Sequence, residues 1–125
     1  MCAIGVDCTG GGTDPLVLAP RYDGWFAPLI SIPAKDIPKN RIGQVSSGHI
    51  ISNRRDKALV IVDLGGGYGG STFEILSENE TEIQGYKGAE KTTRRSIDGK
   101  LRFTNTRTAA LWQFREALDP GQAGG

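Results

Sequence analysis

Two short apolar runs in this sequence each end in an aspartate and are followed by glycines. Residues 2–7, CAIGVD, end at Asp7 and lead into three consecutive glycines, and residues 58–63 end at Asp63 and lead into a stretch with five. Apolar runs without polar alternation are typical of strands that are buried on both faces of a sheet. We therefore expect two central strands, each with a carboxylate and a glycine-rich turn at its carboxyl end.

The segment between these runs predicts an antiparallel meander. Residues 16–22 and 25–32 are rich in β-forming side chains, and Asp23-Gly24 between them is a two-residue hairpin signal. Each of these runs contains a proline, which cannot donate a ladder hydrogen bond, so the hairpin belongs toward the edge of the sheet. We expect the two strands to pair antiparallel with each other and with the strand over residues 2–7.

Helical and strand patterns alternate in the middle of the chain. The spacing predicts a helix over residues 40–55, a helix over 72–79 capped by Ser71, and a strand over 82–88. A βαβ crossover from strand 58–63 to strand 82–88 makes these strands parallel. The predicted fold class is α/β, a mixed sheet of an antiparallel three-strand meander plus parallel strands, flanked by helices.

The last predicted element is a helix over residues 105–118. Thr104 is its expected N-cap, and three apolar residues fall at helical spacing, namely Leu111, Phe114 and Leu118. Trp25 and Trp112 are assigned to packing. A length of 125 residues fits one domain, which we place at residues 1–118, and residues 119–125 are predicted to be a linker-like tail.

Composition and charge exclude several classes of protein. A net charge of +1 excludes a polycationic nucleic-acid binder, so any basic surface must be local. No stretch approaches the roughly 18 apolar residues of a membrane span, and the N-terminus lacks a signal-peptide pattern, which predicts an intracellular protein. Cys2 and Cys8 are expected to be buried thiols on one strand face, too far apart to form a disulfide. Cysteine and histidine are too few for a thiolate and imidazole metal site.

The two aspartates are the strongest candidates for chemistry. Parallel strands end at the same edge of a sheet, so Asp7 and Asp63 should converge and require a shared proton or a cation. Carboxylate oxygens, with room for water and phosphate beside the glycines, suit Mg²⁺ or Mn²⁺. The alternative, with equal weight at this point, is that each aspartate caps its own turn through backbone hydrogen bonds.

The glycine-rich turns also resemble nucleotide-binding loops. IGVDCTGGGT and DLGGGYGGST are similar to the phosphate loops of the actin, Hsp70 and sugar-kinase superfamily. That resemblance implies the nucleotide-binding half of an actin/Hsp70-like ATPase. Against it, such proteins enclose the nucleotide between two domains, whereas this length supplies one, and the sequence contains no lysine-bearing Walker A pattern.

A more specific resemblance covers nearly the whole chain. The segments IGVDCTGGGTDPLVL, IPAKD, IVDLGGGYGGSTFEIL and LRFTNTRTAALWQFREALDP follow one another as in the nuclease domain of the large terminase subunit of tailed bacteriophages and prophages. Asp7 matches the acid that ends the family's first strand, Asp14 an acid in the next turn, and Asp63 the acid that ends its fourth strand. The start of the late helix resembles the family at Phe103, Asn105, Arg107 and Trp112.

The resemblance implies a ribonuclease-H-like fold and a Mg²⁺- or Mn²⁺-dependent DNA endonuclease that acts during genome packaging. Such a domain cuts double-stranded DNA by two-metal phosphodiester hydrolysis. By resemblance, Asp7 bridges the two ions, Asp63 binds one of them, and Asp14 is an outer, loop-organising acid. The implied partners are double-stranded DNA, the terminase small subunit and the portal protein, without a membrane. The implied location is the cytoplasm of the bacterial host, with oligomers only in the packaging motor.

The sequence departs from that family at its end. Family members continue into a further strand and helix with a third essential acid, and they carry an ATPase motor, whereas Asp98 and Asp119 here match no family ligand. We therefore expect a piece of a longer protein, either an expressed fragment or the product of a degenerate prophage gene, with little or no cleavage activity by itself. A catalytically inactive module that binds DNA or the portal protein is a further interpretation.

Residues 88–100 are polar, have no apolar period and are predicted to be a basic loop. The candidates for phosphate contacts in and around it are Lys87, Lys91, Arg94, Arg95, Lys100 and Arg102. The alternative is a solvated charged face. Arg107 opposes the helix dipole at the start of the last helix, which predicts a carboxylate or DNA phosphate as its partner. His49, the only histidine, is expected to be a core or boundary residue rather than a catalytic base.

Overall fold

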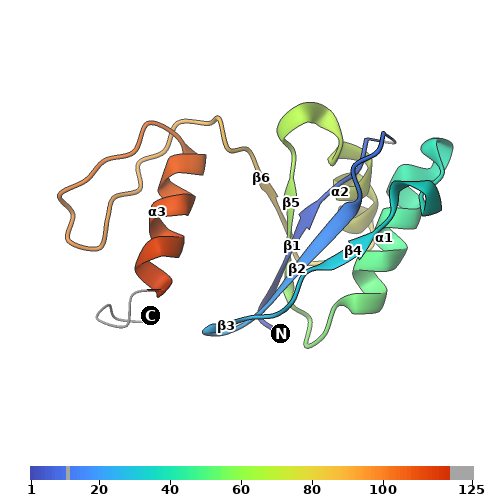
Figure 1. Ribbon diagram of the computed structural model, residues 1–125, viewed down its shortest axis with the longest axis horizontal. Helices are drawn as coiled ribbons and strands as arrows, with labels where there is room; N and C mark the ends of the chain where they lie inside the picture. Colours follow the sequence, from blue (N-terminus) through green and yellow to red (C-terminus); the bar gives the residue numbers. More distant parts are fainter. Residues whose placement is uncertain (11, 119–125) are drawn as a thin grey trace. The chain divides into compact units, whose positions relative to one another are not determined.

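The chain separates into two compact units in the computed structural model. The structure describes residues 1–10 and 12–118, and the predicted tail at 119–125 lies outside them. Unit 1 comprises Met1–Tyr86 and unit 2 comprises Lys87–Gly125. Figure 1 shows the chain coloured along its sequence, from blue at the N-terminus to red toward the C-terminus.

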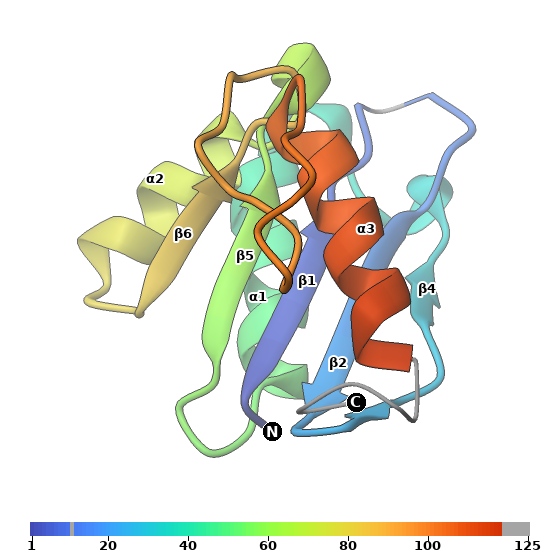
Figure 2. The same cartoon turned by 90° about the vertical axis from the view of Figure 1, so that its left-hand side faces the viewer.

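Unit 1 is built on one mixed sheet (Figure 2). The order is β3-β2-β1-β5-β6, with β4 also paired to β2. β1 pairs antiparallel with β2, whereas β1 with β5 and β5 with β6 are parallel. The predicted fold class and βαβ crossover are therefore confirmed. The strands are β1 (Ala3–Asp7), β2 (Leu16–Tyr22), β3 (Trp25–Phe26), β4 (Ile30–Ile32), β5 (Leu59–Asp63) and β6 (Ile83–Tyr86).

The third strand of the meander is divided in two. The sequence pattern predicts one strand over residues 25–32, but β3 and β4 are separate, and each pairs with β2. Pro28 lies between them and has no N–H to donate, which explains the break. β3 lies at the end of the strand order, so the expected edge position of the hairpin is confirmed.

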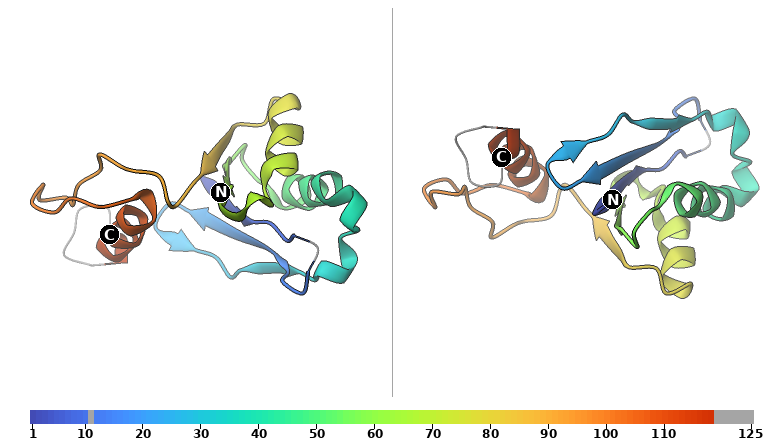
Figure 3. Two further views of the ribbon diagram at one scale, coloured as in Figure 1. Left: turned by 90° about the horizontal axis from the view of Figure 1, so that it is seen from above. Right: turned by 90° about the horizontal axis from the view of Figure 1, so that it is seen from below.

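Two helices cover one face of this sheet (Figure 3). α1 (Ile42–Asn53) follows two short 3₁₀ turns, Ala34–Asp36 and Lys39–Arg41. α2 (Gly70–Glu78) follows another 3₁₀ turn, Gly65–Gly67, and begins without the side-chain cap predicted at Ser71. The buried apolar side chains of the strands alternate along them and form the core with residues of the helices: Ile4, Val6, Leu16, Leu18, Val60, Val62, Ile50 and Leu76.

Unit 2 contains one described helix, α3 (Thr106–Leu118). Its N-terminal cap is Asn105, whose Oδ1 accepts a hydrogen bond from the Thr108 N–H at 2.9 Å, and not Thr104 as predicted. Trp112 packs against Phe103 with ring centroids 6.5 Å apart, which confirms its packing role. None of the described helices is both long and apolar enough to cross a membrane.

Two side-chain environments differ from the prediction. Cys2, which precedes β1, is exposed, whereas Cys8 is buried as expected; both are free thiols. Trp25 is 58% exposed and makes a tilted ring contact with Tyr22 at the sheet edge. On α3 the apolar stripe found at helical spacing is exposed, and the buried residues are Ala109 and Glu116. The exposed stripe consists of Leu111, Phe114 and Leu118.

Candidate metal site and nucleic-acid-binding residues

Asp7 and Asp63 are neighbours on adjacent parallel strands. The register pairs Val6 with Val62, and each aspartate is the next residue of its strand. Neighbouring strands lie about 4.8 Å apart, so the backbone positions that carry the two carboxylates are close together. Strand alternation directs them to the face opposite the buried Val6 and Val62, away from α1 and α2. The predicted convergence at one sheet edge is therefore confirmed for the backbone positions.

The two carboxylates open into one hollow on this face. It has a volume of about 300 Å³, and its floor is formed by small and apolar strand residues such as Gly5, Ala19 and Ile61. Tyr86 also lines it, because it pairs with Asp63 across β5 and β6. Tyr86 was not among the residues predicted for the site. Its position at the end of the third parallel strand, level with the aspartates, is the sequence feature that could have identified it.

The environments of the two acids differ. Asp63 is half-buried, and its Oδ1 accepts a hydrogen bond from the Gly65 N–H at 2.9 Å. It therefore caps its own turn, as the alternative interpretation requires. Asp7 is exposed, and its carboxylate has no hydrogen bond or ion pair with the described residues, so turn capping does not account for it. The pair leaves carboxylate oxygens available to an external ligand.

The buried thiol of Cys8 experiences both negative charges. Burial is the main cause that raises the pKa of Cys8, and the charges of Asp7 and Asp63 raise it further. A hydrogen bond from Sγ to Thr72 Oγ1, 3.8 Å long, lowers the pKa in opposition. The negative potential of the two carboxylates thus reaches the core side of the sheet.

Glycines let the turns that follow β1 and β5 pack closely against the strand ends and each other. A Cβ atom on Gly69 would lie 2.5 Å from the Asp63 carbonyl oxygen, so only glycine lets α2 begin so close to β5. A Cβ on Gly10 would lie 2.5 Å from the ring of Tyr68, which brings the turn after β1 against the turn after β5. The two aspartate-bearing loops are therefore in direct contact.

The other predicted acid, Asp14, is exposed in the connection between β1 and β2. Within residues 1–10 and 12–118, no three His, Cys, Asp or Glu side chains gather in a group that could hold a metal ion. The site therefore has two convergent carboxylates in the part of the chain that the structure describes. His49 is half-buried on α1, which confirms its prediction as a boundary residue.

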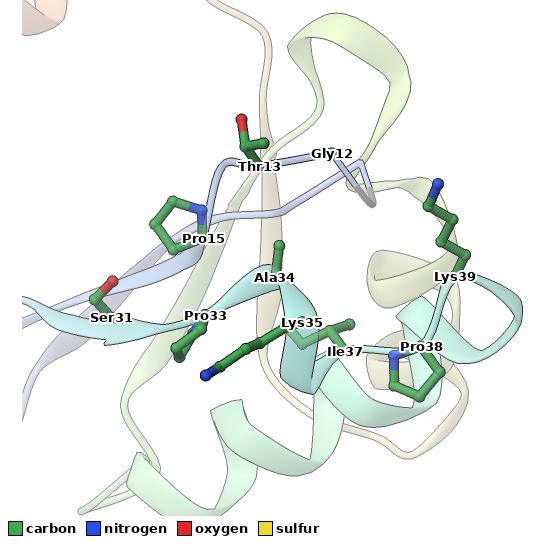
Figure 4. A pocket seen from close by; sticks show the side chains of 10 residues that line it. All are labelled: Gly12, Thr13, Pro15, Ser31, Pro33, Ala34, Lys35, Ile37, Pro38 and Lys39. Carbon is green, nitrogen blue, oxygen red and sulfur yellow. The ribbon is translucent and has the colours of Figure 1, made fainter.

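A larger hollow, of about 740 Å³, lies beside the connection between β1 and β2 and was missed by sequence reasoning (Figure 4). Three prolines contribute to its lining, and Lys35 and Lys39 carry its charges. It contains no acid, histidine or thiol, so the geometry assigns no chemical step to it.

The predicted phosphate-binding residues belong to unit 2 and are all exposed: Lys87, Lys91, Arg94, Arg95, Lys100, Arg102 and Arg107. Residues 87–118 carry eight Lys and Arg against three Asp and Glu, whereas residues 1–86 carry seven against ten. Positive charge is therefore concentrated in unit 2. Lys87 lies 3.8 Å from Glu90, but no described carboxylate forms an ion pair with Arg107, whose guanidinium lies against Gly88.

The structure is similar to that of a solved nuclease domain. That domain belongs to a mutant of the large terminase subunit gp2 of bacterial virus Sf6, with manganese and beta-thujaplicinol. The TM-score is 0.62 at 18% identity, over 92% of this chain and 51% of that chain. No protein-family model matches the sequence, and no curated protein matches it. The chain thus spans about half the length of that nuclease domain and has the predicted ribonuclease-H-like fold.

The contact of Gly69 with β5 predicts a position-specific loss of stability. Gly69→Ala should lower the free energy of unfolding by about 1–3 kcal/mol, because the added methyl group clashes with the Asp63 carbonyl. Gly70→Ala is the matched control, since a Cβ there meets nothing within 4 Å. Urea unfolding followed by tryptophan fluorescence measures both, and equal stability of the two variants would contradict this packing.

Proposed function

We propose that this chain is the nuclease part of a large terminase subunit of a tailed phage or prophage, and that it acts on double-stranded DNA with divalent metal ions. The observation that carries this proposal is the placement of Asp7 and Asp63 side by side at the ends of β1 and β5. The similarity of the fold to a nuclease domain solved with manganese supports it.

The residues at the strand ends fit a divalent cation. Two carboxylates on adjacent strands repel each other unless a proton or a cation lies between them. Their unpaired oxygens are hard ligands, which suit Mg²⁺ or Mn²⁺ and do not suit a soft metal. The glycines nearby leave space for water and for phosphate oxygens. In this proposal Asp7 would hold both ions, Asp63 would hold one of them, and Asp14 would act from the outer loop.

Each group of residues has a separate role in this proposal. Divalent ions held by Asp7 and Asp63 would supply the activation of a water and the stabilisation of the leaving oxygen of the phosphodiester. The Gly65 N–H holds the Asp63 carboxylate in one orientation through its 2.9 Å hydrogen bond. Asp7, which is exposed and without a partner among the described residues, completes the negative site from β1. The basic residues of unit 2 bind the phosphate backbone and keep the duplex on the protein.

The proposed biological setting is genome packaging in the cytoplasm of the bacterial host. There the domain would act within a longer terminase subunit, together with the small subunit and the portal protein. Oligomers belong to the assembled motor. A catalytically inactive DNA-binding module is the second candidate, because the described residues bring two rather than three carboxylates together.

Metal binding tests the site directly. Titration calorimetry with Mn²⁺ should show binding to the parent chain, and Asp7→Asn or Asp63→Asn should weaken it by more than about tenfold, because each removes a charged ligand. Asp36→Asn is the control, because Asp36 is an exposed acid in a 3₁₀ turn outside the hollow. Equal affinity for Mn²⁺ in all four proteins would remove the aspartates from the site.

Cleavage by this chain alone is expected to be weak. Two-metal hydrolysis needs two ions held about 4 Å apart, and two carboxylates provide little charge for both. Supercoiled plasmid should remain intact in millimolar Mg²⁺, with traces of nicking in Mn²⁺, which oxygen-rich sites bind more tightly. Robust cleavage in Mg²⁺ that is abolished by Asp63→Ala and by Asp14→Asn would show instead that Asp14 completes the site.

Salt dependence tests the basic residues of unit 2. If Lys91, Arg94 and Arg95 contact phosphates, their joint replacement by alanine should weaken duplex binding. It should also flatten the plot of log affinity against log salt by about 0.9 per lost contact. Fluorescence anisotropy with a labelled duplex at several salt concentrations measures both effects. The same slope in parent and triple variant would support the solvated-face interpretation.

A further inference from the structure

Residues 94–102 of unit 2 form a closed turn, which we call the basic hairpin (Figure 1, orange). It lies largely within the segment that was predicted to be a basic loop. Arg95 and Arg102 form an antiparallel bridge. The Ser96 N–H donates to the Leu101 carbonyl at 3.2 Å, and the Leu101 N–H donates to Ser96 Oγ at 3.1 Å. The two arms of the basic hairpin are therefore paired.

The tip of the basic hairpin is fixed by side chains. Asp98 Oδ1 accepts hydrogen bonds from the Ser96 hydroxyl at 2.7 Å and from the Lys100 N–H at 3.0 Å. Gly99 takes φ of +75°, which closes the turn and disfavours any other residue. Asp98, the one acid of the basic hairpin, is exposed, and its Oδ1 closes the turn without an ion pair to a described cation.

The basic hairpin is also attached to α3. The Ile97 N–H donates to Oε2 of Glu116 at 2.9 Å, and Glu116 is buried within unit 2. This bond gives the buried Glu116 carboxylate a donor. It also holds the backbone at Ile97 against α3.

The side chains that the basic hairpin presents are apolar at the tip and positive around it. Ile97 is 60% exposed and Leu101 is 44% exposed. Arg95, Lys100 and Arg102 are exposed, and none of them forms an ion pair with a carboxylate of the described residues. Arg95 Nη1 also donates to the Gly99 carbonyl oxygen at 3.4 Å, which leaves its charge without a described carboxylate partner. An apolar tip among such cations fits the groove of a nucleic acid duplex.

We propose that the basic hairpin inserts Ile97 into the minor groove of double-stranded DNA, with Leu101 beside it and with Arg95, Lys100 and Arg102 on the flanking phosphates. This inference rests on the proposed DNA substrate and adds a mode of binding to it. An apolar side chain that enters the groove partly unstacks a base step and bends the duplex, at a cost that flexible steps such as TA keep small.

Insertion of Ile97 as an apolar wedge and contacts with phosphates have different effects on the measured binding. Removal of the wedge leaves the number of displaced counterions unchanged, so the affinity falls while the salt slope stays the same. Base unstacking by the wedge raises the fluorescence of 2-aminopurine placed at a TA step. Phosphate contacts alone change neither base stacking nor the fluorescence of that base.

The experiment compares the parent with Ile97→Ser, Ile97→Leu and the control Ile51→Ser, a 47% exposed isoleucine on α1 of unit 1. A short duplex with central TA steps and 2-aminopurine is titrated at several salt concentrations. We expect Ile97→Ser to bind about tenfold more weakly with the parent salt slope and without the fluorescence increase, because it loses the burial of one large apolar side chain. Ile97→Leu and Ile51→Ser should behave as the parent does.

Other outcomes overturn the inference. If Ile97→Ser binds with the parent affinity, or if the parent binds without unstacking the probe base, the basic hairpin contacts phosphates only. In that case Mn²⁺ binding at Asp7 and Asp63 and duplex binding by the parent still support the proposed function. If the parent does not bind the duplex at any salt concentration, the inference fails together with the proposed substrate.

Discussion

The parallel, in-register pairing of β1 with β5 is the constraint on which the rest of the structure depends. It sets Asp7 beside Asp63 at the carboxyl ends of the two strands, on the face opposite α1 and α2. Two like charges on adjacent strands are stabilised by a cation between them, which is the basis of the proposed metal site. The turns after β1 and β5 are rich in glycine because the chain must leave the two neighbouring strand ends with these turns in contact.

The two faces of the sheet differ in their side chains and in what covers them. One face is covered by α1 and α2 and supplies the apolar core, while the other carries small side chains, the two carboxylates and Tyr86 around an open hollow. Negative charge is concentrated in unit 1 and positive charge in unit 2. The proposed function requires both, because metal ligands must be anionic and the groups that bind the phosphate backbone must be cationic.

Several local predictions failed for reasons that lie outside the local sequence. The helix caps at Ser71 and Thr104 were wrong because more than one polar or glycine residue near each helix start can begin the helix, and tertiary contacts decide among them. Trp25 was assigned to packing but is exposed, and the stripe of Leu111, Phe114 and Leu118 that the helical spacing identified is exposed as well. An amphipathic pattern shows that a face exists, but it does not show what packs against it.

Local sequence signals predicted β1, β2, β5 and β6, their mixed pairing and the two aspartates at the strand ends, because apolar runs, glycine turns and crossover lengths have few topological solutions. The tertiary structure set the features that depend on distant partners. It placed Tyr86 level with Asp63 across β5 and β6, and it buried Glu116 to hold the basic hairpin. It also turned a stretch without periodicity into an ordered turn with Ile97 at its tip. These features arise from hydrogen bonds and register between segments far apart in the chain, which no local pattern encodes.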